Sequence, residues 1–207
     1  MSRVRRVTAY IDGFNLYNGL RDGYQRKYLW LDLEALCGDL LLADQELTSV
    51  KYFTAPVRNN PASLRRQQKF WNALGAHCNV VTIQLGRFQE KTVTCRSCSV
   101  SWPSYEEKET DVGIAVALVE DAAVQAFDTA LVVSADSDLC PAIHAVRRLH
   151  PGARVVAAFP PKRRSDDLRA AVDGSFTIAE RKLQAALLPD PVVSAEGRSF
   201  PRPNRWR

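Results

Sequence analysis

Short apolar runs, most of them rich in β-branched residues, recur along the chain and alternate with stretches whose apolar positions have helical spacing. The apolar runs predict strands at residues 4–11, 49–55, 79–85, 130–133, 153–159 and 175–178. The amphipathic stretches predict helices that begin near residue 16 and cover 32–42, 61–74, 112–124, 141–149, 167–171 and 179–188. Helix 112–124 is apolar nearly all round and is expected to be buried. This alternation is typical of an α/β domain with a mostly parallel central sheet.

Two segments depart from that alternation. Residues 87–94 alternate and favour one strand of a hairpin, and a CxxC motif at Cys95 and Cys98 and a polar loop to residue 107 follow it. Residues 189–207 are rich in Pro, Ser, Gly and Arg and predict a tail with little to bury, in which Trp206 can pack locally. We therefore expect one domain over residues 1–188 with an insertion at about 87–107, and a basic tail over 189–207.

The composition indicates the general class of protein but does not identify its function. The 207 residues are 46% hydrophobic, enough for a sizeable core. The net charge of +5 and the pI of about 9.1 are compatible with a polyanionic partner. No long apolar run suggests a membrane span, and five cysteines without a disulfide spacing suggest the reducing cytoplasm.

Acidic residues follow the predicted strands at two places. Asp12 ends the first strand and Asn15 lies three residues later, while Asp136 and Asp138 follow the strand 130–133. Each can simply cap a helix, which Asp does well. Asp111 opens helix 112–124, where the helix dipole alone would favour it. The carboxyl ends of parallel strands meet at one sheet edge, and right-handed crossovers bring the first strand close to the strand 130–133. We therefore expect these acidic residues to converge at that edge.

Four converging carboxylates would repel one another, by about 4 kcal/mol per pair at 4 Å and an effective dielectric constant of 20. A divalent cation relieves that repulsion, and oxygen-only ligands suit Mg²⁺ or Mn²⁺. Asp12, Asp111, Asp136 and Asp138 are therefore candidate metal ligands. Lys162, Arg163 and Arg164 follow the strand 153–159 and form either a phosphate-facing rim or a solvent loop.

The CxxC motif can be half of a zinc site, because two thiolates on one tight turn bind one side of a metal ion, whereas a closed structural site needs four ligands. No second CxxC exists, so Cys37, His77 and Cys78 complete a zinc site with Cys95 and Cys98 only if the fold brings them together. A solvent-side turn and redox chemistry are the alternatives.

Three motifs in order resemble the NYN domain family of the PIN-like nuclease superfamily: Y-I-D-G-F-N-L at 10–16, K-x-x-D-V at 108–112 and S-A-D-S-D-L at 134–139. The resemblance covers about residues 4–178 and implies a three-layer α/β/α sandwich and a metal-dependent endoribonuclease. It assigns metal binding to the four aspartates and the orientation of a water or phosphate to Asn15. Lys108 and Ser134 are expected to contact the substrate or support its loop. The CxxC insertion departs from a minimal domain.

RNA is the expected partner, with DNA and self-association left open. The main alternative is a PIN-like module that binds RNA or protein without cutting. A Toprim-like domain would have glutamate rather than Asp12 at the first strand end. A haloacid-dehalogenase-like phosphatase would have a second aspartate where Phe14 stands.

Overall fold

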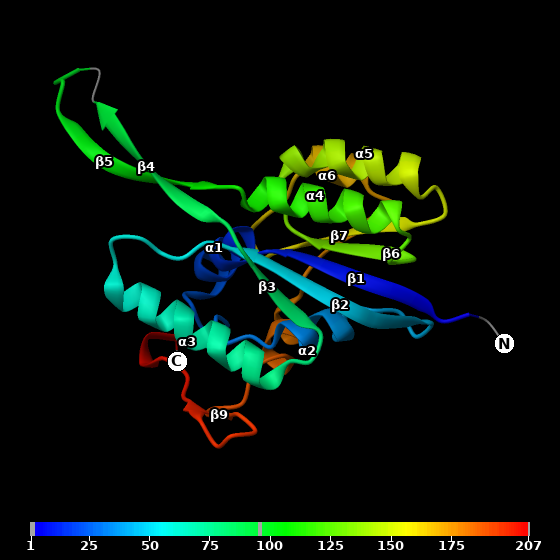
Figure 1. Cartoon of the computed structure of the whole chain (residues 1–207), viewed down its shortest axis with the longest axis horizontal. Coiled ribbons are helices and arrows are strands. Elements are labelled where there is room, and N and C mark those ends of the chain that lie inside the picture. Colours follow the sequence, from blue (N-terminus) through cyan, green and yellow to red (C-terminus); the bar gives the residue numbers. More distant parts are fainter. Residues whose placement is uncertain (1–2, 95–96, 207) are drawn as a thin grey trace.

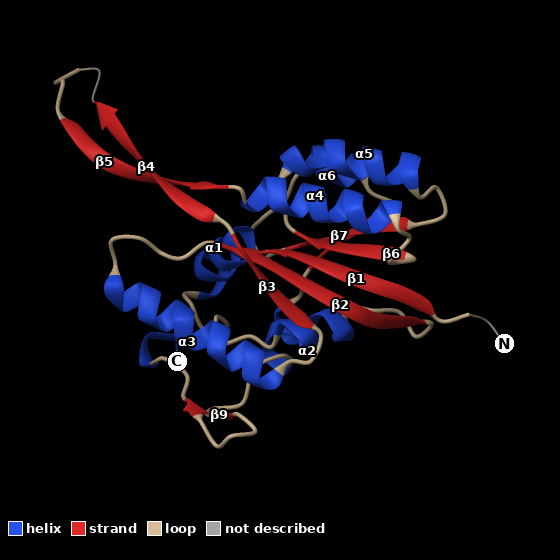
Figure 2. Ribbon diagram, in the orientation of Figure 1, coloured by secondary structure: helices blue, strands red, loops and turns tan. Residues whose placement is uncertain are grey.

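The computed structural model describes residues 3–94 and 97–206. Within them, six parallel strands form one sheet in the order β3-β2-β1-β6-β7-β8 (Figures 1 and 2). The strands are β1 (Arg5–Asp12), β2 (Gln45–Thr54), β3 (Val81–Leu85), β6 (Thr129–Val133), β7 (Arg154–Phe159) and β8 (Gly174–Thr177). The predicted sheet is confirmed, and β2 begins four residues earlier than the apolar pattern indicates.

The strand order changes direction between β1 and β6. From β1 the chain steps outward through β2 to β3, then returns to β6 and steps outward on the other side through β7 to β8. β1 and β6 pair in register, with Ile11 opposite Val133, so Asp12 and Ser134 follow neighbouring strand ends. This reversal is the point at which open α/β sheets form their sites, and the predicted proximity of β1 and β6 is confirmed.

Helices cover both faces of the sheet and complete the three layers (Figure 2). One face carries α1 (Gly13–Tyr24), α2 (Leu33–Asp39), α3 (Pro61–His77) and α7 (Glu180–Ala185), and the other carries α4 (Thr110–Ala123), α5 (Cys140–Leu149) and α6 (Asp166–Ala171). Each face buries its own apolar cluster. Alternate strand residues divide between the clusters, as Ile11 and Tyr10 show.

Two helix predictions need correction. α4 is not buried all round, because Val112 and Val116 are 65% and 48% exposed and only one side of the helix packs on the sheet. α3 does not end at Gly75 but runs to His77. A single exposed glycine costs a helix about 1 kcal/mol, which is too little to end a helix that packs through Phe70 and Leu74.

The insertion forms a two-stranded antiparallel arm that projects from the body (Figure 1). β4 (Arg87–Thr94) pairs with β5 (Ser101–Lys108), which confirms the hairpin. The polar loop predicted up to residue 107 is wrong over β5. Its sequence contains Pro103 and two glutamates, which are poor strand formers, and pairing with β4 overrides that propensity.

The last residues are packed onto α3 rather than left with little to bury. β9 (Val192–Val193) and β10 (Ser199–Phe200) form a short hairpin, and the 3-10 helix η2 (Asn204–Trp206) follows. Val192 is 1% exposed, and the Trp206 ring, 8% exposed, lies 6.0 Å from the Phe70 ring and 6.4 Å from the Trp30 ring. None of the described helices is long and apolar enough to cross a membrane.

Trp206→Ala should lower the free energy of unfolding by about 3 kcal/mol, the low end for a buried aromatic residue. The reason is that Trp206 contacts both Trp30 and Phe70 in the larger core cluster. Urea unfolding monitored by far-UV circular dichroism measures it. An unchanged midpoint would show that the packing of the last residues contributes nothing to stability.

Candidate active site at the β1–β6 edge

Asp12 is the buried centre of a hydrogen-bond network that joins two strand ends. Its carboxylate is 3% exposed. The backbone N–H of Asn15 donates to Oδ1 at 2.8 Å, and Ser134 Oγ donates to Oδ2 at 2.8 Å. Asp12 therefore caps α1, as the simpler interpretation predicts, and also ties β1 to the segment after β6.

Asn15 and Ser134 extend this network into the loop after β6. Asn15 Oδ1 accepts from the Ala135 N–H at 3.3 Å, and Ser134 Oγ accepts from the Asp136 N–H at 3.1 Å. Asp136 is the N-cap of the 3-10 helix η1 (Ser137–Leu139), and its Oδ1 accepts from the Asp138 N–H at 2.9 Å. The loop is thus fixed with its two aspartates at the sheet edge.

Asp111 reaches the same edge from α4. It lies in the first turn of α4, next to η1. Desolvation and the negative charges of Asp136 and Asp138 raise the pKa of Asp111. The charges of Asp136 and Asp138 therefore act on Asp111 although the residues are distant in the sequence; that these aspartates and Asp12 share one ion stays a prediction.

Within the described side chains, no cation balances that repulsion. Among the side chains that the structure describes, no Lys, Arg or His forms an ion pair with Asp111, Asp136 or Asp138. Oxygen donors of like charge suit a hard divalent cation. Within residues 3–94 and 97–206, however, no three acidic, His or Cys side chains stand where they can hold one ion. Binding would require new side-chain rotamers; the exposed Asp111 and Asp138 have room for them.

Asp111→Asn should stabilise the protein by about 0.5 kcal/mol at pH 7 in EDTA, a small effect because the carboxylate is exposed. The raised pKa means that the folded state holds the Asp111 proton more tightly than the unfolded state does. The charge therefore lowers the free energy of unfolding in full above the raised folded-state pKa. This cost shrinks as pH falls from that pKa to the pKa of unfolded aspartate, and it is absent below it.

Thermal unfolding of wild type and Asp111→Asn between pH 3 and pH 8 measures this difference, which should shrink towards acid pH. A variant less stable than wild type at pH 7 would show that the helix dipole outweighs the repulsion at Asp111.

The three predicted basic residues lie in the loop after β7, at the same sheet edge. Arg163 forms an ion pair with Asp22 of α1, and Arg164 pairs with Asp166 at 2.9 Å. Lys162 is exposed, and within the described chain it has no ion pair. Gly19 lets α1 approach this loop, since a Cβ there would lie 2.7 Å from Pro160 Cβ. Lys162 is thus the cation of this loop most available to a phosphate.

The remaining predicted site residues are Lys108 and the cysteines. Lys108 ends β5, next to Glu109 and α4, and the position of its side chain is not described. Cys95 lies outside the described residues. Cys98 is exposed between β4 and β5, whereas Cys37 and Cys78 lie in and near α2 at the opposite end of the molecule (Figure 1). A zinc site that combines Cys98 with Cys37, His77 and Cys78 is therefore wrong.

Cys37, His77 and Cys78 gather instead around Asp32. Cys78 Sγ lies 3.5 Å from Asp32 Oδ1, and His77 Nε2 lies 3.0 Å from Asp32 Oδ2. Burial raises the pKa of both Cys37 and Cys78 to about 12. Within residues 3–94 and 97–206 no three His, Cys or acidic side chains are placed to hold one metal ion, and this group around Asp32 is no exception.

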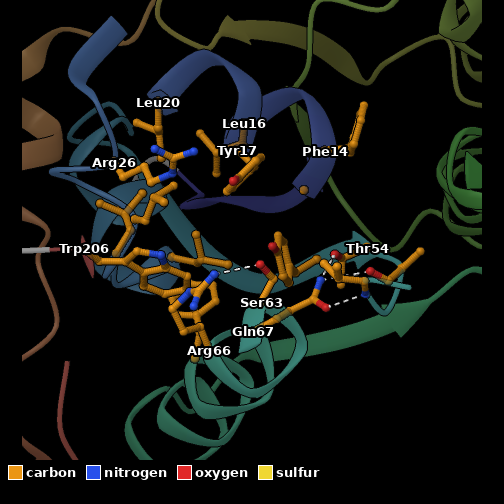
Figure 3. A pocket seen from close by; sticks show the side chains of 18 of the residues that line it. Phe14, Leu16, Tyr17, Leu20, Arg26, Thr54, Ser63, Arg66, Gln67 and Trp206 are labelled. Carbon is orange, nitrogen blue, oxygen red and sulfur yellow. Dashed lines mark hydrogen bonds between the residues drawn. The ribbon is translucent and has the colours of Figure 1, made fainter. Parts of the chain in front are cut away.

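The sequence gives no sign of a cavity of about 460 Å³ on the other side of the first turn of α1 (Figure 3). Its walls come from α1, from the end of β2, from α3 and from η2. These segments are far apart along the chain, and no motif marks them as one site.

Comparison with known proteins places the chain among related sequences and folds. A family model described as the NYN domain matches residues 6–180. A 6-hydroxy-3-succinoylpyridine 3-monooxygenase of Pseudomonas putida is 27% identical, over 77% of this chain and 61% of that protein. The chain thus spans less than two thirds of this relative. A crystal structure of a protein of unknown function from Vibrio parahaemolyticus has a TM-score of 0.56 at 17% identity, and the match covers 87% of this chain and 96% of that one, which supports the fold.

Proposed function

Because this chain belongs to the NYN domain family, and so to the PIN-like nuclease superfamily, we propose that it is a metal-dependent endoribonuclease. One observation carries the proposal: at the reversal of strand order, where Asp12 ends β1, the charges of Asp136 and Asp138 raise the pKa of Asp111, and no described cation pairs with these three. Repelling carboxylates held at a sheet edge are destabilising unless they serve a ligand of opposite charge.

Asp12, Asp111, Asp136 and Asp138 would hold Mg²⁺ or Mn²⁺. The bound cation would supply charge stabilisation for a phosphodiester and lower the pKa of water. Asp12 keeps its orientation through Ser134 and the Asn15 N–H. Asn15 Oδ1 holds the loop that carries Asp136. Lys162 would attract a flanking phosphate, and Arg163 and Arg164 would do so by exchanging their present carboxylate partners.

The direct test is incubation of the purified protein with single-stranded RNA, duplex RNA and single-stranded DNA, in Mg²⁺, Mn²⁺ or EDTA. We expect RNA products with Mg²⁺ or Mn²⁺ and none in EDTA. Cleavage that persists in EDTA would refute the role of the metal. Faster cleavage of DNA than of RNA would refute RNA as the preferred substrate.

The alternative is a module that binds RNA or protein without cutting it. It is favoured by the lack, in the described chain, of three donors already placed around one ion. It predicts RNA binding without products in any metal. The name of the Pseudomonas relative assigns that protein a monooxygenase activity, and the partial coverage leaves open whether the shared region carries it.

A further inference from the structure

The cavity beside α1 has an apolar interior and an open mouth. Six apolar side chains of its lining come from α1, the segment after it, α2 and α3: Leu16, Leu20, Leu29, Leu31, Leu33 and Phe70. Its volume of about 460 Å³ lies within the range of about 300–1,000 Å³ typical of small-ligand sites.

The polar part of the lining is positive. Arg26, Arg66 and Arg205 line the cavity, and its described lining contains no acidic side chain. None of the three forms an ion pair within the described part of the chain. Arg66 Nη2 donates to the neutral Ser63 Oγ at 2.7 Å. Guanidinium groups without carboxylate partners beside an apolar interior favour a ligand that has both an apolar body and an anionic group.

The side-chain amide of Gln67, at the centre of Figure 3, already forms hydrogen bonds within the protein. Its Nε2 donates to the Ala55 carbonyl at 2.9 Å, and its Oε1 accepts from the Val57 N–H at 2.9 Å. Gln67 therefore shapes the loop between β2 and α3 and leaves the arginines as the main donors to a ligand.

Two aromatic side chains of α1, Phe14 and Tyr17, belong to the lining of the cavity. Figure 3 shows Tyr17 beside the cavity and Phe14 on the outer side of the helix. Phe14 is 50% exposed and Tyr17 is 37% exposed, and they lie three residues apart on α1. Exposed rings next to cations are the usual elements that hold unpaired bases, at about 1–3 kcal/mol per stacked base.

From this chemistry we infer that the cavity binds one nucleotide, with the base inside and the phosphate on the arginines. The inference rests on the proposed function, because the cavity adjoins the candidate active site. Gly13 lines the cavity and directly follows Asp12, so the first turn of α1 has the acidic edge on one side and the cavity on the other. An RNA strand held by one unpaired base would thereby be positioned beside Asp12.

The chain offers a matched pair of variants to test this. Arg66 and Arg65 are adjacent on α3 and carry the same charge, but only Arg66 lines the cavity. Binding of a short labelled single-stranded RNA is measured by fluorescence anisotropy in EDTA. Arg66→Ala should weaken binding about tenfold, the effect of losing one charge-assisted hydrogen bond, and Arg65→Ala less than twofold. Equal losses of RNA affinity in the two variants would refute binding in the cavity, because general attraction between charges would then explain both.

A second variant separates binding from folding. Arg26 has φ of 76° and Gln25 before it has φ of 50°, in the left-handed region that favours glycine. Arg26→Gly removes the guanidinium group from a backbone that suits glycine, so the protein should remain folded. We again expect about tenfold weaker binding. Unchanged affinity in both Arg26→Gly and Arg66→Ala would refute the proposal.

Competition identifies the source of the nucleotide. An RNA with one abasic position should bind more weakly than the intact strand if the cavity takes a base of the chain. Competition by adenosine or uridine monophosphate at a lower concentration than the RNA would assign the cavity to a free nucleotide. Phenyl phosphate that competes as well as a mononucleotide would overturn nucleotide recognition. All of these binding measurements are made in EDTA, so they do not depend on cleavage. If Arg66→Ala weakens RNA binding but the wild-type protein cleaves no RNA in Mg²⁺ or Mn²⁺, the endoribonuclease proposal is refuted and the nucleotide site stands.

Discussion

Asp136→Asn will lower the rate of Mg²⁺- or Mn²⁺-dependent RNA cleavage by at least about a hundredfold, the usual loss when one group that stabilises transition-state charge is removed. The substitution removes a charge that faces Asp111 but keeps an oxygen that can accept from the Asp138 N–H, as Asp136 Oδ1 does at 2.9 Å. The cap of η1 should therefore survive. Single-turnover cleavage of a labelled RNA measures the effect, with circular dichroism to confirm the fold.

Asp39→Asn is the matched control. Asp39 ends α2, away from the β1–β6 edge, and pairs with Lys182 at 2.9 Å in a partly exposed ion pair. Losing that pair costs at most about 1 kcal/mol, and cleavage should be unchanged. If Asp136→Asn cleaves at the wild-type rate, the acidic edge is not catalytic. If both variants lose activity equally, the loss comes from the fold and not from the site.

The sequence identifies the acidic edge because the signals there are local. Asp12 and Asp136 each end an apolar run, and the topological rules for parallel sheets then bring the runs together. The structure confirms the pairing of β1 with β6 and adds what spacing does not contain, namely the bond from Ser134 Oγ to Asp12 and the contact of Asn15 with Ala135. Those bonds depend on side-chain directions that are set only after packing.

Other features could not be predicted from the sequence because tertiary contacts determine them. β5 forms despite its proline and its acidic residues because β4 lies beside it. The side of α4 that contains Val112 stays exposed because the sheet covers only the other side. The cavity needs Arg205 and Trp206 to meet Leu16 and Phe70 across the whole length of the chain. No short window of sequence contains such a site, whereas a strand followed by an aspartate fits within one.

The same Gly→Ala substitution should have opposite effects at Gly13 and Gly75. Gly13 opens α1 against β2, and a Cβ there would lie 2.6 Å from the Phe53 carbonyl oxygen and 2.7 Å from Tyr52 Cε2. Because a strand backbone cannot move aside as a flexible side chain can, α1 must shift, at a cost of about 3 kcal/mol, the upper end for overpacking.

Gly75 in α3 is exposed, and a Cβ there would meet nothing within 4 Å. Gly75→Ala should raise the free energy of unfolding by about 0.5–1 kcal/mol through helix propensity alone. Urea unfolding of the two variants measures both changes in the free energy of unfolding. The shift of α1 in Gly13→Ala would also move Asn15 and Phe14, so that variant should lose RNA cleavage and nucleotide affinity together. A Gly13→Ala protein as stable and active as wild type would mean that the approach of α1 to β2 determines neither site.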